Sequence, residues 1–399
     1  MSQADPATSK VFPSDFHPRL VMWGTYDTGK PRVRILLRGL RENGIELIEC
    51  HRSLWEGIAD KSQLSDRKTK LRLGLRWLGA YPKLIYNYLR IEQHDAVLVS
   101  YMGQADVLAL WLFAKLRRKP IIWDAFLSLY NTVVEDRRLV HRHHPLAFLL
   151  FALEWLACRA ADAVVLDTAI HGRYFVDRFH IRATKVHRVF VGVEPENFHP
   201  AIGPPPSGRE RPPFRVLFYG QFIPLHGIET VVQAAKLSEG DGTHWHLIGT
   251  GQEAHRIRSL IGELSLSNLD WERWVAYEDL LKHIHSVDVC LGIFGATEKA
   301  KRVIPNKVYQ IIASGKPLIT ADSVAIRELL QPGPSLVLIP AADPVALRRA
   351  VLEVRDSRRT TDSIAHPELR ERIKPSMVVR PLTTLIARFA HPRSDSATA

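Results

Sequence analysis

The sequence alternates short apolar runs with longer amphipathic stretches on both sides of one proline- and glycine-rich segment. That segment, His199–Pro213, reads HPAIGPPPSGRERPP and shows no apolar period. Short apolar runs separated by amphipathic stretches are typical of parallel strands joined by crossover helices. The chain of 399 residues also exceeds the roughly 250 to 300 residues at which a single hydrophobic core stops growing. We therefore predict an α/β protein with two tandem, Rossmann-like, doubly wound domains that face a central cleft.

The expected domain boundaries follow from the same pattern. An N-terminal domain is expected over residues 1–200, a linker over 201–213 and a C-terminal domain over 214–374. Apolar residues at helical spacing predict a closing helix within 375–399, and the polar end HPRSDSATA predicts a disordered tail. The candidate strands are the short apolar runs Leu20–Trp23, Ile45–Cys50, Ala96–Ser100, Pro120–Trp123, Ala163–Asp167, His187–Val191, Phe214–Tyr219, His244–Ile248, Val287–Ile293 and Pro317–Thr320.

Composition narrows the class of protein. With 46% hydrophobic and 24% charged residues, the chain has the balance of a globular protein and not of a disordered one. Three widely spaced cysteines offer neither a disulfide framework nor a paired metal site, and the first twenty residues lack the pattern of a secretory signal. The apolar stretch Pro145–Cys158 is shorter than the roughly 20 residues that span a bilayer, so we interpret it as a buried helix. We expect a cytoplasmic protein, and its net charge of +12 favours an anionic partner.

Two loops that follow predicted strands have the composition of anion-binding turns. Gly24 opens the loop after the first strand and allows a tight turn into a helix whose free N–H groups attract anions. Gly220 opens the first loop of the second domain, in which Gln221 and His226 can donate hydrogen bonds to phosphate oxygens. The alternative for both loops is an ordinary strand-to-helix turn. Their place after a strand favours binding, because ligands of open α/β sheets lie at the carboxyl ends of strands.

The segment Gly292–Thr320 contains a cluster of cations before and at the start of a predicted helix. Cations and a helix N-terminus together stabilise the negative charge that develops on a diphosphate leaving group. An amide further along the same helix can bind a ribose hydroxyl. The alternative is a solvated basic loop. The candidates for donor binding in this segment are Gly295, Lys299, Lys301, Arg302, Asn306, Lys307 and Gln310.

Two further motifs suggest other ligands. Gly249 begins GTGQEA, which follows a predicted strand and matches the looser dinucleotide fingerprint GxGxxA, so a dehydrogenase is one alternative. That fingerprint normally lies in the first βαβ unit, and here it lies in the second unit of the second domain, so Gly249 is also a donor-binding candidate. The histidines of HRHHP lack the ligand spacing of a metal site, and no DxD pair is present. We therefore expect neither a metal nor a cofactor.

A basic amphipathic segment lies between Lys61 and Tyr88. Basic helices that also carry aromatic residues bind anionic lipid surfaces. The alternative is a helix whose apolar face packs on the first domain, and the two interpretations are compatible. The membrane-facing or acceptor-facing candidates are Arg67, Lys68, Lys70, Arg72, Arg76 and Trp77. The basic residues form no aromatic-lined stripe, so we expect no nucleic-acid partner.

Taken together, these segments resemble a known family. KVHRVFVGVEPENFHP ends the first domain, and YGQFIPLHGIETVVQAA, HLIGTGQE, VAYEDLLKHIHSVDVCLGIFG and VIPNKVYQIIASGKPLIT follow in order. This order resembles the family four, or group 1, retaining glycosyltransferases, whose two-domain fold is called GT-B. The resemblance implies an N-terminal acceptor domain and a C-terminal domain for the nucleotide-sugar donor. It also implies retention of the anomeric configuration by front-face attack without a protein nucleophile.

The sequence departs from the family pattern at the donor loops. The family usually places arginine and lysine in the first donor loop, where this chain has Gln221 and His226. The common glutamate pair falls on Arg302 and Gln310. We hypothesise that the cation cluster of Gly292–Thr320 compensates for these changes.

The segment WDAFLSLYNTVVEDR follows a predicted strand of the first domain. It contains Asp124, Tyr130, Glu135 and Asp136, which are placed to face the cleft. We predict that Asp124 orients the acceptor as the catalytic residue, and the alternative for Asp124 is a helix-capping aspartate.

These observations lead to one functional expectation and three alternatives. We expect a retaining hexosyltransferase that moves a sugar from a nucleotide-diphosphate donor to a lipid-linked or polysaccharide acceptor, in the cytoplasm or as a peripheral protein at the inner face of the cell membrane. The alternatives are a nucleotide-sugar epimerase of the same fold, a non-catalytic nucleotide-sugar binding protein, and the dehydrogenase suggested by Gly249.

Overall fold

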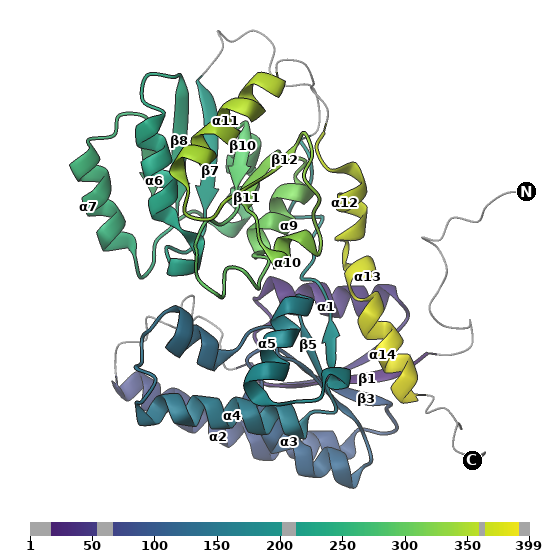
Figure 1. Cartoon of the computed structure of the whole chain (residues 1–399). Helices are drawn as coiled ribbons and strands as arrows, with labels where there is room; N and C mark the ends of the chain where they lie inside the picture. The colour runs from purple at the N-terminus through teal and green to yellow at the C-terminus, as the bar shows by residue number, and fades with distance from the viewer. Residues whose placement is uncertain (1–16, 54–66, 202–212, 359–363, 391–399) are drawn as a thin grey trace, which may run out of the picture. The chain divides into compact units, whose positions relative to one another are not determined.

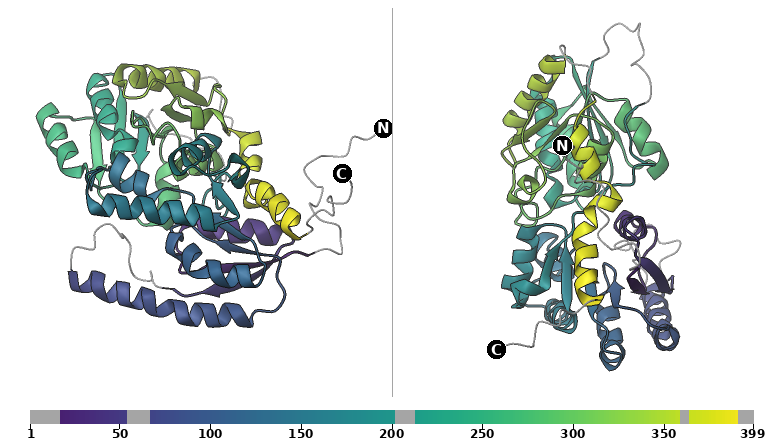
Figure 2. Two further views of the ribbon diagram at one scale, coloured as in Figure 1. Left: turned by 60° about the horizontal axis from the view of Figure 1, so that its bottom comes forward. Right: turned by 90° about the vertical axis from the view of Figure 1, so that its right-hand side faces the viewer.

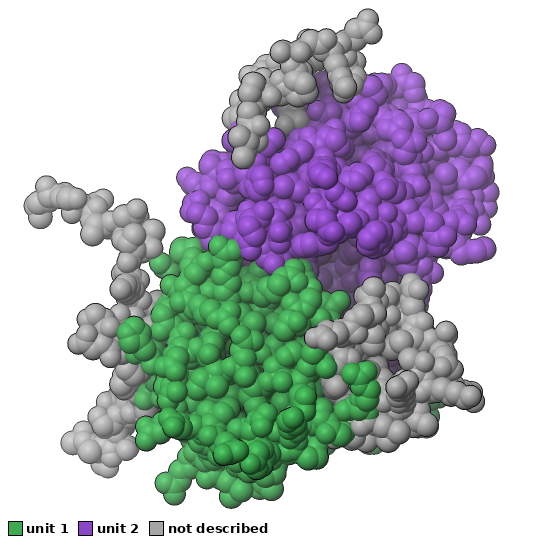
Figure 3. Space-filling view, turned by 180° about the vertical axis from the view of Figure 1, so that it is seen from behind, with its two compact units in different colours: residues 1–132, 140–190, 375–399 green, residues 133–139, 191–374 purple. Residues whose placement is uncertain are grey.

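The computed structural model describes residues 17–53, 67–201, 213–358 and 364–390. The chain divides into two compact units, which are coloured separately in Figure 3. Unit 1 contains residues 1–132, 140–190 and 375–399, and unit 2 contains residues 133–139 and 191–374. The C-terminal segment thus returns to unit 1, and a short segment from the first half of the sequence belongs to unit 2.

The described residues of unit 1 form a six-stranded parallel sheet with the order β2-β1-β3-β4-β5-β6. The order changes direction between β1 and β3. The strands are β1 (Arg19–Gly24), β2 (Glu46–His51), β3 (Ala96–Val99), β4 (Ile121–Asp124), β5 (Ala163–Leu166) and β6 (Val186–Arg188). The strands β3, β4 and β5 are buried at every position, as expected for a parallel sheet covered on both faces.

Helices cover both faces of this sheet (Figure 1). On one face lie α2 (Arg67–Arg90), α3 (Gln104–Leu116), α4 (Pro145–Ala160) and α5 (Ala169–Phe179). On the other lie α1 (Pro31–Glu42), α13 (Pro375–Val378) and α14 (Arg380–Ala390). A short π-helix, Asn131–Asp136, precedes α4, and a 3₁₀ turn, Ala183–Lys185, precedes β6. The long helix α2 lies beside α3, and α3 lies beside α4 (Figure 2).

The described part of unit 2 also forms a six-stranded parallel sheet, with the order β12-β11-β10-β7-β8-β9. The order changes direction between β7 and β10. The strands are β7 (Phe214–Tyr219), β8 (Thr243–Ile248), β9 (Leu269–Glu272), β10 (Val289–Leu291), β11 (Leu318–Ala321) and β12 (Leu336–Ile339).

Helices flank this second sheet as well. One face is covered by α6 (Ile228–Leu237), α7 (Ala254–Leu264) and α11 (Pro344–Arg358). The remaining helices are α8 (Leu280–His285), α9 (Asn306–Ala313), α10 (Val324–Arg327) and α12 (Pro367–Arg372). Two 3₁₀ turns, Pro224–His226 and Tyr277–Asp279, precede α6 and α8.

The structure confirms the predicted fold class and corrects several details. Each predicted strand is present within a few residues, but β9 and β12 were missed. β9 has no residue that is fully buried, which explains its weak apolar signal. Apart from residues 133–139, the chain passes from unit 1 to unit 2 between residues 190 and 191. The predicted linker, residues 201–213, lies almost entirely outside the described residues. The helix expected to be buried over Pro145–Cys158 instead exposes much of its apolar surface.

Candidate functional site

The carboxyl ends of β7, β8 and β10 bring three loops of unit 2 together. β7 and β10 are neighbours in the sheet, and this is the point at which the strand order reverses. Open α/β sheets bind ligands at such a point, outside the carboxyl ends of the strands. Gly220 and Gln221 follow β7, Gly249 follows β8, and Gly295 follows β10. Four of the predicted donor-binding residues therefore lie at one edge of one sheet.

Glycine is required where these loops approach one another. Gly220 has a φ of +139°, and a Cβ atom there would lie 3.2 Å from Lys307 Nζ and 3.1 Å from His226 Cε1. Gly249 has a φ of +144°, and its Cβ would lie 1.9 Å from the carbonyl oxygen of Gly220. L-residues with a side chain avoid these φ values. The backbone N–H of Gly295 donates to the carbonyl of Leu225, which joins the loops after β10 and β7.

Lys307 carries the main charge beneath these loops. It is the second residue of α9, and its side chain is buried. Its Nζ donates to the carbonyl oxygen of Gly292 at 3.3 Å and lies 3.6 Å from the centroid of the Phe218 ring. No described carboxylate forms an ion pair with it, and burial holds the pKa of Lys307 well below its usual value. Burial thus disfavours the ammonium form of Lys307, and an anion bound beside Nζ would favour it.

His226 lies against the same group. Its Nδ1 donates to the carbonyl of Gln221, which fixes the tautomer with a proton on Nδ1. Burial, and then the positive charge of Lys307, hold the pKa of His226 well below its usual value. His226 is therefore neutral at pH 7 in the protein without ligand.

The predicted cation cluster divides into two groups. Lys299 is buried, as is Lys307. Lys301 and Arg302 instead pair with Glu298, at 2.6 Å and 3.6 Å. The charges of Lys301 and Arg302 are thus already balanced in part by Glu298, whereas Lys307 forms no ion pair with a described carboxylate.

The start and the middle of α9 hold the last two candidates. Asn306 is the first residue of α9. The side chain of Gln310 is buried, and its amide oxygen accepts a hydrogen bond of 3.1 Å from the hydroxyl of Tyr219. This bond orients the amide of Gln310 and leaves the amide nitrogen as the group able to donate to a ligand.

A segment that sequence reasoning assigned to the first domain contacts these loops. Arg137 Nη2 donates to the side-chain oxygen of Gln221 at 3.3 Å, and Gln252 Nε2 donates to the carbonyl of Arg137 at 3.1 Å. Thr297 Oγ1 donates to Asp136 Oδ1 at 3.1 Å. Asp136 was noted as a candidate, but Arg137 was missed, because no local pattern reveals a contact 84 residues away.

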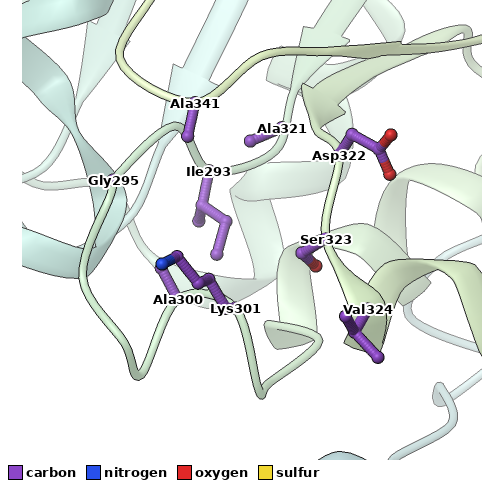
Figure 4. A pocket seen from close by; sticks show the side chains of 9 residues that line it. All are labelled: Ile293, Gly295, Ala300, Lys301, Ala321, Asp322, Ser323, Val324 and Ala341. Atoms are coloured by element: carbon purple, nitrogen blue, oxygen red, sulfur yellow. The ribbon is translucent and has the colours of Figure 1, made fainter.

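A cavity of about 240 Å³ lies beside this site, at the carboxyl ends of β10 and β11 (Figure 4). It is lined by Ile293, Gly295, Ala300, Lys301, Ala321, Asp322, Ser323, Val324 and Ala341. Pockets that enclose drug-sized ligands usually measure about 300 to 1,000 Å³. The cavity is therefore too small to enclose a whole nucleotide.

Comparisons with known proteins place part of the chain in a known family. The family model described as Glycosyl transferases group 1 matches residues 213–357. This stretch contains the three loops and Lys307. Residues 213–357 form a group 1 glycosyltransferase domain. The predicted resemblance to this family is thereby confirmed.

The amylovoran biosynthesis glycosyltransferase AmsK of Erwinia amylovora is 20% identical over 264 residues. The match covers 65% of this chain, and it spans 61% of the length of AmsK. Two solved structures share the fold over most of the chain. HepE of Anabaena, in complex with UDP and glucose, has a TM-score of 0.62 at 12% identity and covers 93% of this chain and 100% of its own. Sucrose-phosphate synthase of Thermosynechococcus elongatus has a TM-score of 0.63 at 15% identity, with 94% and 98% covered. The predicted GT-B fold is thereby confirmed.

One group of metal-ligating side chains occurs among the described residues of the glycosyltransferase domain. His246 of β8, Glu272 of β9 and His283 of α8 place their ligand atoms within 4.8 Å of one another. Imidazole and carboxylate groups in this number suit a transition metal. The cluster uses none of the predicted donor-binding residues.

In unit 1, the predicted catalytic residue Asp124 forms a buried ion pair with Arg32. Asp124, at the end of β4, is fully buried, and its two oxygens accept from Arg32 Nη2 at 2.7 Å and from Arg32 Nε at 3.1 Å. Arg32 also donates to the carbonyls of Val189 and Phe190. The carboxylate of Asp124 thus fixes α1 and the segment after β6 to the sheet. This geometry does not support the predicted role of orienting an acceptor.

Gly24 of unit 1 packs closely against the side chain of Asp106. Its φ is +125°, and a Cβ would lie 2.3 Å from Asp106 Oδ2. That carboxylate accepts from the backbone N–H and the hydroxyl of Thr25 and from the hydroxyl of Tyr81. Asp106, rather than an external anion, therefore occupies the space beside Gly24.

Sequence reasoning missed a buried dyad at the carboxyl end of β5. Asp167 follows β5, and its Oδ1 lies 2.7 Å from Nδ1 of His171 in the first turn of α5. The other ring nitrogen of His171 is buried without a hydrogen-bond partner among the described residues. The carboxylate of Asp167 accepts from Nδ1 and so orients the imidazole ring of His171.

The predicted membrane-facing residues lie on α2. Arg76 is exposed, and the side chains of Arg67, Lys68, Lys70, Arg72 and Trp77 lie outside the described part of the structure. Among the helices of the described ranges, none reaches the combination of length and hydropathy that crossing a bilayer demands.

Proposed function

We propose that this protein is a retaining glycosyltransferase that moves a sugar from a nucleoside-diphosphate donor to a lipid-linked or polysaccharide acceptor at a membrane surface. The observation that carries the proposal is Lys307, a buried ammonium group without a carboxylate partner among the described residues, at the strand-order reversal of the glycosyltransferase domain. A diphosphate bound there would supply the missing negative charge, and the first turn of α9 would add its free N–H groups.

Glycosyl transfer requires that the nucleoside diphosphate be stabilised as it leaves. In glycosyl transfer, the bond between the anomeric carbon and the β-phosphate oxygen breaks, and its electron pair stays on the nucleoside diphosphate. An acceptor oxygen forms the new bond to the anomeric carbon, and its proton goes to the leaving phosphate in a retaining front-face reaction. Fixed cations lower the barrier because the phosphate gains charge in the transition state. Lys307 is the group that we assign to this task.

The relatives suggest the class of donor and acceptor. HepE was solved with UDP and glucose, which favours a uridine-nucleotide sugar. AmsK is named for the biosynthesis of amylovoran, which favours a surface polysaccharide as the product class. Sugar nucleotides are made inside cells, so we propose the inner face of the cell membrane as the place of the reaction.

The surface of unit 1 supports the proposal that the protein acts at a membrane. The helix α4 exposes Phe148 at 74% and Leu149 at 60%, near its N-terminal end. The exposed cation Arg142 lies three residues before this helix. Exposed apolar side chains with a cation nearby in sequence suit an anionic lipid bilayer, which accepts the side chains and attracts the charge.

A thermal-shift screen tests the donor assignment. UDP, GDP, ADP and dTDP, each with its glucose conjugate, are compared with NAD, because a ligand that binds the folded state raises the melting temperature. We expect a response to one nucleoside diphosphate and none to NAD. A response to NAD alone would establish the dehydrogenase alternative. Turnover to free sugar without an acceptor would favour the epimerase.

Lys307→Met tests the site itself. Methionine removes a buried, unpaired charge but retains most of the volume, so the free energy of unfolding should stay the same or rise. Binding of the nucleoside diphosphate should weaken by about tenfold or more, the scale of a charge-assisted hydrogen bond. Lys282→Met, at an exposed lysine of α8, is the matched control. Equal binding by both variants would contradict the assignment.

A further inference from the structure

Residues 133–139 belong to unit 2 although the chain on either side of them belongs to unit 1. Their polar groups meet all three loops of the donor site. Arg137 contacts Gln221 after β7, the carbonyl of Arg137 accepts from Gln252 after β8, and Asp136 accepts from Thr297 after β10. The segment is thus part of the glycosyltransferase site by contact, although it lies more than seventy residues before that domain in sequence.

The guanidinium of Arg137 has hydrogen-bonding groups without a partner among the described residues. Its Nη2 makes a long hydrogen bond of 3.3 Å to Gln221, while its Nε is buried without a partner among the described residues. No described carboxylate forms an ion pair with its guanidinium. The charge of Arg137 also reaches His226, where it helps to lower the pKa of the imidazole. Arg137 and Lys307 therefore act on the same place from different segments, and nothing in the described chain neutralises either of them.

Only one of the two carboxylate oxygens of Asp136 has a hydrogen-bond partner among the described residues. Its Oδ1 accepts from Thr297 Oγ1, while its Oδ2 is buried without a hydrogen-bond partner among the described residues. The donor loop after β10 has its own acidic residue, Glu298, but that side chain is exposed and pairs with Lys301 and Arg302. A buried, unpaired carboxylate oxygen is costly, and a hydroxyl donor would satisfy it.

We propose that Asp136 and Arg137 complete the donor site, with Arg137 on the diphosphate beside Lys307 and Asp136 on a hydroxyl of the transferred sugar. The inference rests on the proposed function, since it assumes a nucleoside-diphosphate sugar as the ligand. A planar guanidinium suits phosphate oxygens because it offers several donors in fixed directions. A carboxylate suits a sugar because it accepts from hydroxyl groups without competing for the phosphate.

Two variants separate these roles. Arg137→Gln should weaken both the nucleoside diphosphate and its glucose conjugate by about tenfold, because the lost group binds the part that they share. Asp136→Asn should leave the affinity for the nucleoside diphosphate within about twofold, and weaken the glucose conjugate and slow transfer by about tenfold, because an amide replaces a charged acceptor. The neighbouring exposed residues supply matched controls of equal charge change, Arg138→Gln and Glu135→Gln.

The measurement is calorimetric titration of the full-length protein with UDP, GDP, ADP and dTDP and with their glucose conjugates. Melting curves of each variant confirm that the protein is folded at the titration temperature. The expected results are weaker binding of both ligands by Arg137→Gln, and weaker binding of the glucose conjugate alone by Asp136→Asn. Variants that bind as tightly as their controls would overturn the inference alone. Absence of binding by the unaltered protein would overturn the proposed function, and the inference with it.

Discussion

At the scale of single residues, position in a loop did not reveal what a charged side chain does. Asp124 is the last residue of β4 and Asp136 lies twelve residues further along the chain, and both carry a buried carboxylate. The oxygens of Asp124 are both taken by Arg32, whereas one oxygen of Asp136 is unpaired in the described structure. The carboxylate of Asp124 is thus satisfied by an ion pair within unit 1, whereas the carboxylate of Asp136 is satisfied only in part.

The Arg32–Asp124 pair gives a prediction about stability. Arg32→Met or Asp124→Leu alone should lower the free energy of unfolding by about 3 to 5 kcal/mol, because each leaves a buried charge without its partner. The double variant should lose less than either single change, since it removes both charges. Urea denaturation of the three variants measures this. An Asp124→Asn protein with unaltered stability and no transfer activity would instead support the catalytic role predicted from sequence.

His94 gives a prediction about pH. It is buried, its Nε2 lies 3.2 Å from the hydroxyl of Tyr88, and burial lowers the pKa of His94 from 6.5 to about 4. Between these values the unfolded chain binds a proton that the folded protein does not, so stability falls as the pH drops from 6.5 to 4. His94→Gln should make the fall shallower, as followed by thermal unfolding at several pH values. His255→Gln, at an exposed position of α7, should leave the slope unchanged.

At the scale of elements, the return of the C-terminal segment to unit 1 depends on close packing. Asn43 at the end of α1 donates to the carbonyl of Ser376, and α13 lies against α1. The apolar residues of α14 then extend the core on the same face of the sheet. The helical period after Pro375 predicted one closing helix where the structure has α13 and α14, and it did not predict the face of the sheet that they cover.

Two helical glycines test that packing. A Cβ at Gly39 of α1 would lie 2.3 Å from the carbonyl oxygen of Pro375, so Gly39→Ala should destabilise the protein by about 1 to 3 kcal/mol. A Cβ at Gly79 of α2 meets no atom within 4 Å. Gly79→Ala should therefore stabilise by up to about 1 kcal/mol through helix propensity. Equal midpoints in denaturant for both variants would argue against a tight contact between α1 and α13.

At the scale of the whole molecule, unit 1 carries the apolar surface and unit 2 the candidate anion site. The helix α4 was predicted to be buried, and its exposed face is the clearest correction to the composition argument. An apolar helix at a surface needs a partner that accepts it. The proposed partner is the membrane that holds the acceptor.

Sedimentation with lipid vesicles tests this surface. Binding to vesicles that contain phosphatidylglycerol should exceed binding to phosphatidylcholine vesicles and should weaken with salt, because the exposed cation Arg142 before α4 contributes. Phe148→Ser combined with Leu149→Ser should reduce binding by about tenfold or more, since each inserted side chain contributes about 1.5 to 3 kcal/mol. Leu237→Ser, at an exposed leucine of unit 2, is the control. Unchanged sedimentation of the double variant would remove α4 from the membrane proposal.

The sequence by itself determined the α/β class, most of the strands and the loops that hold the candidate donor-binding residues. These features depend on local periodicity and on glycines at turns, such as Gly220, which a short stretch of chain already specifies. The hydrogen-bond partners of Asp124 and Arg137 were decided by the tertiary structure alone. Arg32 lies 92 residues from Asp124, and Gln221 lies 84 residues from Arg137. Whether a buried charge is neutralised depends on which distant group the fold places beside it, and no local pattern in the sequence contains that information.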